Sequence, residues 1–297
     1  LITSNATSAA HYFGFSGVTV TSGISYTGSI FVKKGTGKYF QLLYGSGGFS
    51  TTKYMTFDLE SGTIVYNGAN ASGTIEAIGK NGWYRLSITA TANTTTTDTL
   101  YCGIVTSGTS TRLEQHTSIL TYSIYGSQLE TGNVASSYIP TQGSASTRVA
   151  ETASGAGNSE VFNDSEGVLF ANIAALSNDG TNRMISLTNG VSPTSNATLY
   201  FIPAANQIRY IYEVSSSQRC SIIANVNVLL SNKCSAVYKL NRFELWVNGF
   251  KVGEDTNGTI NPEGTFTKLS FLRGASQLPF YGKTKEIGYY DTILTDL

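Results

Sequence analysis

The side chains of this sequence that could cut a polysaccharide are its carboxylates. Glycoside hydrolysis needs two carboxyl groups that flank the same bond, about 5–5.5 Å apart in retaining enzymes. Residues two apart in a strand share a face, and Asp58 and Glu60 are the strand-like pair with this spacing. They lead directly into a Ser-Gly pair, which favours a solvated turn. Glu254 and Asp255 are adjacent, so they would point to opposite faces of a strand. The carboxylates therefore argue against an enzyme.

Other groups that could do catalysis or bind a metal are few. The two histidines, His11 and His116, lie in no recognisable motif, so a Ser/His/Asp triad is unsupported. The cysteines, Cys102, Cys220 and Cys234, form no Cys-x-x-Cys motif and no Cys/His cluster, which argues against a zinc site. Their odd number does not suggest a disulfide framework. We expect buried free thiols, with a Cys220–Cys234 bridge across a hairpin as the alternative.

Residues that could bind a sugar are abundant. Aromatic rings stack on the apolar C–H faces of a pyranose, and Asn, Asp, Arg and Gln side chains bond its hydroxyls. An expected strand over residues 207–213 places two tyrosines on one face, and polar residues lie in nearby loops, the usual place for ligand contacts on a rigid sandwich. The candidate glycan-binding residues are Tyr210, Tyr212, Arg219, Asn182 and Arg183.

Two other features have a structural and a functional interpretation. Asp179 lies in the same polar loop as Asn182 and could bind Ca²⁺ through carboxylate and carbonyl oxygens. One carboxylate is thin support, so ordinary turn chemistry is favoured there and no cofactor is otherwise expected. Trp83 and Trp246 are interpreted as core or edge packing, because tryptophan is common in the cores of β-sandwiches.

The composition excludes several classes of protein. The 297 residues include 19 Lys+Arg and 19 Asp+Glu, and only 13% are charged. Without a surplus of positive charge we expect no nucleic-acid partner. No apolar run approaches the ~20 residues that span a bilayer, so no membrane insertion is expected. Low charge with 11% aromatic residues is typical of a β-sheet protein.

Almost every segment alternates between apolar and polar residues, as strands do. Asn248-Gly249 is the strongest hairpin signal, because both residues tolerate the positive φ of a type I′ turn. Residues 143–158 are rich in Gly, Ala, Ser and Thr and contain one large apolar residue, Val149, which indicates a linker. We expect an all-β fold with two tandem antiparallel β-sandwich (jelly-roll) domains, residues 1–148 and 164–297, joined by a linker over 149–163. The expected strands cover residues 26–33, 39–44, 54–59, 63–66, 83–90, 100–105, 118–125, 167–173, 184–187, 198–202, 207–214, 220–228, 235–240, 242–247, 268–272 and 284–290.

The first half resembles jelly-roll domains of bacteriophage tail and minor structural proteins, which are similar to carbohydrate-binding modules. The closing motif of that family matches GSQLETG (126–132), SSYIPT (136–141) and the Thr-Arg pair at 147–148. Further matches are SIFVKK (29–34), FDLESGT (57–63) and NGWYR (81–85). The resemblance covers residues 1 to about 150.

The second half resembles concanavalin A-like (laminin-G-like) lectin and glucanase sandwiches of phage fibres and adhesins. The matching residues are EGVLFA (166–171), AVY (236–238), ELWVNG (244–249), YG (281–282), EI (286–287), YD (290–291) and ILTD (293–296). Glucanases of that fold carry their carboxylates as Glu-x-Asp-x-x-Glu on one strand, and this motif is absent here. Both ends look cut relative to the two families, so we expect the chain to be part of a longer virion protein.

These resemblances imply a phage tail-fibre or receptor-binding segment, on the virion, that adheres to host cell-surface polysaccharide. They also imply contacts with other virion proteins and a homo-oligomer, often a trimer in fibres. A purely structural capsid, neck or baseplate decoration protein is the first alternative. A polysaccharide depolymerase is the second, and the missing carboxylate motif disfavours it.

Overall fold

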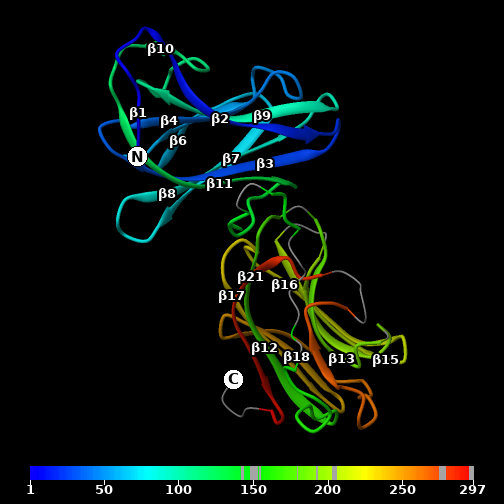
Figure 1. Ribbon diagram of the computed structural model, residues 1–297. Coiled ribbons are helices and arrows are strands. Elements are labelled where there is room, and N and C mark those ends of the chain that lie inside the picture. Colours follow the sequence, from blue (N-terminus) through cyan, green and yellow to red (C-terminus); the bar gives the residue numbers. More distant parts are fainter. Residues whose placement is uncertain are drawn as a thin grey trace. The chain divides into compact units, whose positions relative to one another are not determined.

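The chain consists of two compact units, Leu1–Ser146 and Thr147–Leu297. The computed structural model describes residues 1–141, 144–147, 153, 155–178, 180–191, 193–202, 206–273 and 279–293. Every regular element in this part of the chain is a β-strand (Figure 1). No helix among the described residues is long and apolar enough to cross a bilayer. The predicted all-β fold is confirmed.

The first unit contains two antiparallel sheets, with strand orders β1-β11-β3-β8-β7 and β10-β2-β9-β4-β5-β6. Figure 1 draws these strands from blue to green. They are β1 (Ile2–Thr3), β2 (Ala9–Val20), β3 (Ser25–Lys34), β4 (Tyr39–Tyr44), β5 (Tyr54–Asp58), β6 (Thr63–Asn67), β7 (Ala71–Ile78), β8 (Trp83–Thr91), β9 (Thr96–Val105), β10 (Gln115–His116) and β11 (Thr121–Thr131).

The second unit also contains two antiparallel sheets, ordered β19-β18-β17-β12-β21 and β16-β15-β14-β13-β20. Figure 1 draws them from green to red. Their strands are β12 (Glu166–Ala175), β13 (Arg183–Thr188), β14 (Asn196–Phe201), β15 (Gln207–Val214), β16 (Ser217–Asn225), β17 (Asn232–Lys239), β18 (Arg242–Val247), β19 (Phe250–Asp255), β20 (Lys268–Ser270) and β21 (Gly282–Tyr290).

Each unit has its own hydrophobic core, built from the apolar positions of alternating strands. In the first unit Ile30 and Val32 of β3 belong to the same buried cluster as Phe40 of β4. In the second unit Leu169 of β12 and Leu199 of β14 share the other cluster. Burying a side chain of this size contributes about 1.5–3 kcal/mol. The alternation of apolar and polar residues predicted for residues 26–33 therefore places Ile30 and Val32 in the core.

The structure differs from the sequence-based expectation in its strands and in the linker. The strand pattern does not predict β1, β2, β7, β10 and β19. The predicted linker over 149–163 is wrong at its C-terminal end, because Phe162 is only 4% exposed in the core of the second unit. The carbonyl of Asn163 also accepts a hydrogen bond of 2.6 Å from the Tyr238 hydroxyl. Residues 149–152 and 154 lie outside the described residues.

The Asn248-Gly249 turn adopts the predicted geometry between β18 and β19. The φ angles are 53° at Asn248 and 87° at Gly249, as a type I′ turn requires. The Asn248 side chain supports the turn, since its Oδ1 accepts a hydrogen bond of 2.9 Å from the backbone N–H of Lys233. The turn thereby fixes the end of β18 beside β17.

All three cysteines are buried free thiols, which confirms the favoured interpretation. Cys220 lies on β16 and Cys234 on β17, in opposite sheets of the second unit. Burial raises the pKa of both thiols to about 12. Thiolate is the reactive form of cysteine, so native protein should be inert.

We expect a thiol-reactive chromophore at pH 8 to label no cysteine of the native protein within minutes. Three thiols should react once a denaturant exposes the cores. Rapid labelling of the native chain, or only one reactive thiol after denaturation, would contradict the burial of these residues or their free state.

Asp58 and Glu60, the carboxylates that could have formed a catalytic pair, stabilise the turn after β5. The backbone N–H groups of Glu60 and Ser61 donate to Asp58 Oδ1 at 2.8 and 3.2 Å. Lys38 Nζ lies 3.2 Å from both carboxylates. Burial alone would raise the pKa of Asp58, but these N–H groups and the Lys38 ammonium outweigh it and lower that pKa. A carboxyl group held ionised is unsuited to act as a general acid.

The lowered pKa of Asp58 makes a pH-dependent contribution to stability. The ionised carboxylate stabilises the fold above the unfolded-state pKa of about 3.9, and the contribution is lost as the pH falls through the lower folded-state pKa. We expect Asp58→Asn to lower the free energy of unfolding at pH 7 by about 1.5–3 kcal/mol. Thermal unfolding from pH 7 to pH 2 checks this, and a difference that persists at pH 2 would argue against it.

Candidate functional site

Tyr210 and Tyr212 are not available to a ligand, so their assignment as glycan-binding residues is wrong. Both side chains are 0% exposed, in the core of the second unit. The Tyr210 hydroxyl donates to the carbonyl of Val237 at 3.2 Å, and the backbone N–H of Asn261 donates to the Tyr212 hydroxyl at 3.1 Å. The two rings do share a face of β15, as predicted, but that face points into the sandwich.

The other predicted residues do not form one site. Arg183 is 5% exposed and donates to the carbonyls of Ser177 and Thr181, so it orders its own loop. Arg183 and the half-buried Asn182 lie at one end of the sheet β16-β15-β14-β13-β20, the end that contains Ile208. Arg219 lies toward the other end, near Glu213. Five residues of strand separate these two ends, about 17 Å.

Asp179, the candidate calcium ligand, lies outside the described residues. No group of three or more His, Cys, Asp or Glu side chains that could hold a metal ion occurs in the part of the chain that the structure describes.

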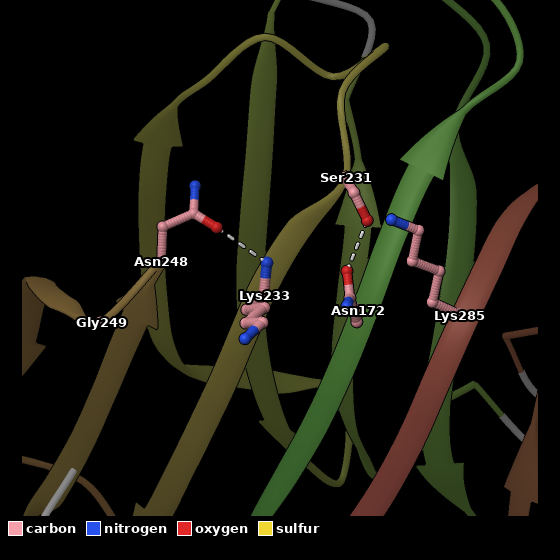
Figure 2. Close-up of a pocket in the computed structure, with 6 residues that line it drawn as sticks. All are labelled: Asn172, Ser231, Lys233, Asn248, Gly249 and Lys285. Atoms are coloured by element: carbon pink, nitrogen blue, oxygen red, sulfur yellow. Dashed lines mark hydrogen bonds between the residues drawn. The ribbon is translucent and has the colours of Figure 1, made fainter.

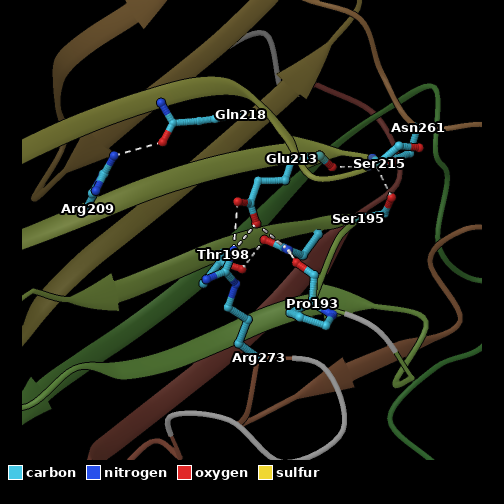
Figure 3. Close-up of polar contacts among 10 residues, drawn as sticks. Pro193, Ser195, Thr198, Arg209, Glu213, Ser215, Gln218, Asn261 and Arg273 are labelled. Carbon is cyan, nitrogen blue, oxygen red and sulfur yellow. Dashed lines mark hydrogen bonds and ion pairs between the residues drawn. The ribbon is translucent and has the colours of Figure 1, made fainter.

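The outward face of β14 and β15 is occupied by a closed polar network (Figure 3). The Glu213 carboxylate accepts hydrogen bonds from Asn196 Nδ2 at 2.7 Å and from Arg273 Nη2 at 2.6 and 2.8 Å. Ser186 Oγ donates to the carbonyl of Leu272 at 2.5 Å, so residues 271–273 run along this face. The network uses its own donors and acceptors and is best explained as support for the sheet.

Two other carboxylates face each other on the opposite sheet. Glu244 and Glu254 are register partners on β18 and β19. Glu244 binds Arg242 Nε at 2.9 Å and accepts a hydrogen bond from Trp246 Nε1 at 2.8 Å. Burial would raise the pKa of Glu244, but Arg242 and the indole N–H outweigh it and lower that pKa. An acid for glycoside hydrolysis needs a raised pKa, and the pKa of Glu244 is lowered, so Glu244 is unsuited to that role.

The first unit presents a group of tyrosines on the outward face of the sheet β10-β2-β9-β4-β5-β6. Leu42 and Met55 point into the core, so the alternate positions on β4 and β5 point outward. Besides Tyr39 on β4, four tyrosines occupy outward positions on four strands, and the fully buried Leu43 lies between Tyr101 and Tyr54 in the register. We call Tyr12 (β2), Tyr101 (β9), Tyr54 (β5) and Tyr66 (β6) the tyrosine face.

The tyrosine face consists of two ring pairs. Tyr12 and Tyr101 meet edge to face with centroids 5.4 Å apart, and Tyr54 and Tyr66 stack at 4.6 Å with 18° between their planes. Tyr12 is 52% and Tyr66 38% exposed. Tyr101 and Tyr54 are two strands apart, about 10 Å. The pairs therefore form the two sides of one surface.

The hydroxyl of Tyr54 stays a hydrogen-bond donor at neutral pH. Burial and the neighbouring Tyr66 hydroxyl raise the pKa of Tyr54 to about 12. The face thus combines apolar ring surface with neutral phenol groups, which are the groups that stack on and hydrogen-bond to sugars.

The loop between β9 and β10, residues 106–114, brings Arg112 onto the tyrosine face. The loop is fastened by Gln41, a fully buried side chain that points outward from β4. Gln41 Nε2 donates to the carbonyls of Ser110 and Thr111 at 3.3 and 3.2 Å, and its Oε1 accepts from the N–H of Leu113 at 3.0 Å. These bonds satisfy a buried amide that would otherwise cost stability.

Arg112 reaches the C-terminal end of β4, where its Nη2 donates to the carbonyl of Tyr44 at 2.9 Å. Its positive charge partly offsets the rise in the pKa of Tyr54. Arg112 is half-buried, and its Nε is buried with no hydrogen-bond partner among the described residues. A guanidinium has five N–H donors, so N–H groups of its terminal nitrogens remain for ligand hydroxyls.

The sequence analysis did not find this site. Tyr12 lies on β2, which the strand pattern does not predict, although the alternation of His11, Phe13 and Phe15 with Tyr12 and Gly14 is the signal that could have revealed it. Arg112 lies in a loop whose path follows from Gln41 and not from any local motif.

Comparisons with known proteins found distant likenesses among solved structures. No family model and no curated protein matches the chain. It is similar to the CBM40 of a Ruminococcus gnavus IT-sialidase in a structure bound to alpha2,3 sialyllactose, with 15% identity, a TM-score of 0.39, and coverage of 45% of this chain and 80% of that chain. It is also similar to domains LG4-5 of the mouse laminin alpha1 chain, with 11% identity, a TM-score of 0.33, and coverage of 96% and 90%. Likenesses this distant assign neither a ligand nor a family.

Proposed function

We propose that this chain is a non-enzymatic glycan-binding protein that uses the tyrosine face and Arg112. The observation that carries the proposal is the arrangement of two tyrosine pairs, about 10 Å apart, on one outward sheet face with an arginine delivered between their strands. Rings that are already packed lose little entropy when a ligand binds. The rings, phenol groups and guanidinium of the site are groups that bind sugars.

A glycan array with the full chain tests this function. We expect saturable binding to at least one bacterial surface polysaccharide and no release of reducing sugar from it. Release of reducing ends would favour the depolymerase alternative. Absence of binding to any polysaccharide would remove the proposal.

The setting of this function is proposed from the sequence resemblance to phage tail proteins. We propose that the chain belongs to a virion appendage that adheres to host cell-surface polysaccharide, a setting in which weak sites gain avidity. Repetition of one weak site in a homo-oligomer such as a trimeric fibre raises the overall affinity without new contacts. Labelling of intact particles with an antibody to this chain checks the setting, and label at distal fibre tips supports it.

A structural role is the second candidate, and one observation favours it. Strand β6 forms an edge of its sheet, carries no charge, and exposes Ile64, Val65 and Tyr66 by 36%, 41% and 38%. An exposed, uncharged edge strand is a template for pairing with another chain. Antibody label over the shell, neck or baseplate, together with no glycan binding, would favour contacts with other virion proteins.

A further inference from the structure

The second unit has a hollow of about 480 Å³ on the outward face of the sheet β19-β18-β17-β12-β21 (Figure 2). Its lining comes from three strands and from the turn that follows β18. The six lining residues are Asn172, Ser231, Lys233, Asn248, Gly249 and Lys285. None of these residues is among the predicted glycan-binding residues, and none belongs to the tyrosine face.

The amide oxygens of the hollow are already used by the protein. Asn172 Oδ1 accepts from Ser231 Oγ at 2.6 Å, and Asn248 Oδ1 accepts from the N–H of Lys233 at 2.9 Å. Figure 2 shows both bonds. Each amide keeps its NH₂ group as a donor, although one N–H of Asn248 already donates to Asn232 Oδ1 at 3.2 Å. The hollow therefore offers mainly hydrogen-bond donors.

The charge of the hollow is positive. Lys233 and Lys285 are both exposed, and neither forms an ion pair with a described residue. Figure 2 shows the Lys285 side chain extending toward Ser231 and Asn172. Glu286, the register partner of Asn172, is the neighbouring carboxylate on β21, and it leaves the group with a net positive charge. Two ammonium groups with two amide donors match an oxyanion.

Apolar rings lie next to the hollow on the same sheet face. Phe170 is two residues before Asn172 on β12, and Trp246 is two residues before Asn248, which is about 7 Å along a strand. Both rings are half-buried, and Ser235 lies between them as the register partner of each. A small residue between two rings leaves room for a flat ligand.

We propose that this hollow binds the oxyanion, a carboxylate or a sulfate, of an acidic sugar whose ring lies beside Trp246 and Phe170. The site is in the second unit and is separate from the tyrosine face, so either can fail without the other. Carboxylate and sulfate present the same acceptor chemistry, and the choice between them is made by experiment.

Fluorescence of Trp246 tests the proposal in the full chain. The chain has two tryptophans, so a Trp83→Phe background leaves Trp246 as the only one. The probes are polygalacturonate for carboxylates, dextran sulfate for sulfates, and neutral dextran. We expect a saturable change in emission with at least one acidic polymer and none with dextran, and the acidic polymer that acts identifies the oxyanion. A response to dextran equal to that of the acidic polymers, or no response to either acidic polymer, would overturn the proposal.

Matched variants separate a built site from general charge attraction. Lys233→Gln with Lys285→Gln should weaken the active polymer roughly tenfold or more, and Asn172→Asp should do the same by placing a negative charge in the hollow. The control is Lys80→Gln with Lys268→Gln, which removes two exposed lysines and gives the same net charge. Equal weakening in the control would show nonspecific attraction and refute the site. Unchanged thermal unfolding of each variant excludes loss of the fold.

Discussion

Tyr12→Ala combined with Tyr66→Ala should reduce glycan binding on the order of a hundredfold, because each substitution removes one exposed ring from the tyrosine face. The two residues stand on β2 and β6, on either side of the strands that carry Tyr101 and Tyr54. They are 52% and 38% exposed, so their truncation should change the stability of the first unit little. Titration calorimetry with the polysaccharide found on the array, together with the melting temperature, measures both effects.

A matched control for this double variant is Tyr125→Ala. Tyr125 is 60% exposed on β11, in the other sheet of the same unit, where it packs against Tyr138 and Phe31. Its truncation removes the same groups from a different face and should leave the affinity unchanged. If Tyr125→Ala abolished binding while the double variant bound normally, the ligand site would lie on the β1-β11-β3-β8-β7 sheet.

Gln41→Leu should lower the free energy of unfolding of the first unit by about 2–4 kcal/mol and also remove glycan binding. Leucine has a similar volume but makes none of the bonds to Ser110, Thr111 and Leu113. Each buried backbone group left unpaired costs about 1–3 kcal/mol. Without these hydrogen bonds the loop 106–114 is no longer held against the sheet, so Arg112 loses its position on the tyrosine face. Denaturant unfolding and calorimetric titration of the same sample check the two effects.

Gln128→Leu is the matched control for this second prediction. Gln128 Oε1 accepts a hydrogen bond of 2.9 Å from the N–H of Ile139, so it fastens a different segment over the opposite sheet. This variant should destabilise the first unit and leave glycan binding intact. Binding that falls equally in both variants would mean that general loosening of the unit, and not the position of Arg112, controls affinity.

Some of the architecture could be predicted because it is local. The alternation over residues 26–33 and the Asn248-Gly249 pair specify strands and a turn through neighbouring residues alone. The pattern does not predict β2, in which eleven of the twelve residues are half-buried or exposed and two are the glycines Gly14 and Gly17. Glycine is depleted in strands, and in β2 the pairing with β9 outweighs that preference.

The candidate site depends on which face of each sheet is buried, and patterns of neighbouring residues do not reveal this. Period-two alternation placed Tyr210 and Tyr212 together on one face, and they do share it. It could not say that this face is the inner one, because tyrosine suits both a sandwich core and a sugar site. Arg112 and Tyr12 are 100 residues apart in the numbering and come to the same sheet face only through the strand pairing and the loop held by Gln41.

The sequence by itself determined that the chain forms strands and which residues of a strand lie on the same side. Only the tertiary structure decided which side of each sheet is packed against its partner and which remains in water. The physical reason is that strand formation depends on the properties of adjacent residues, whereas burial depends on sheets and loops that pair across long stretches of chain.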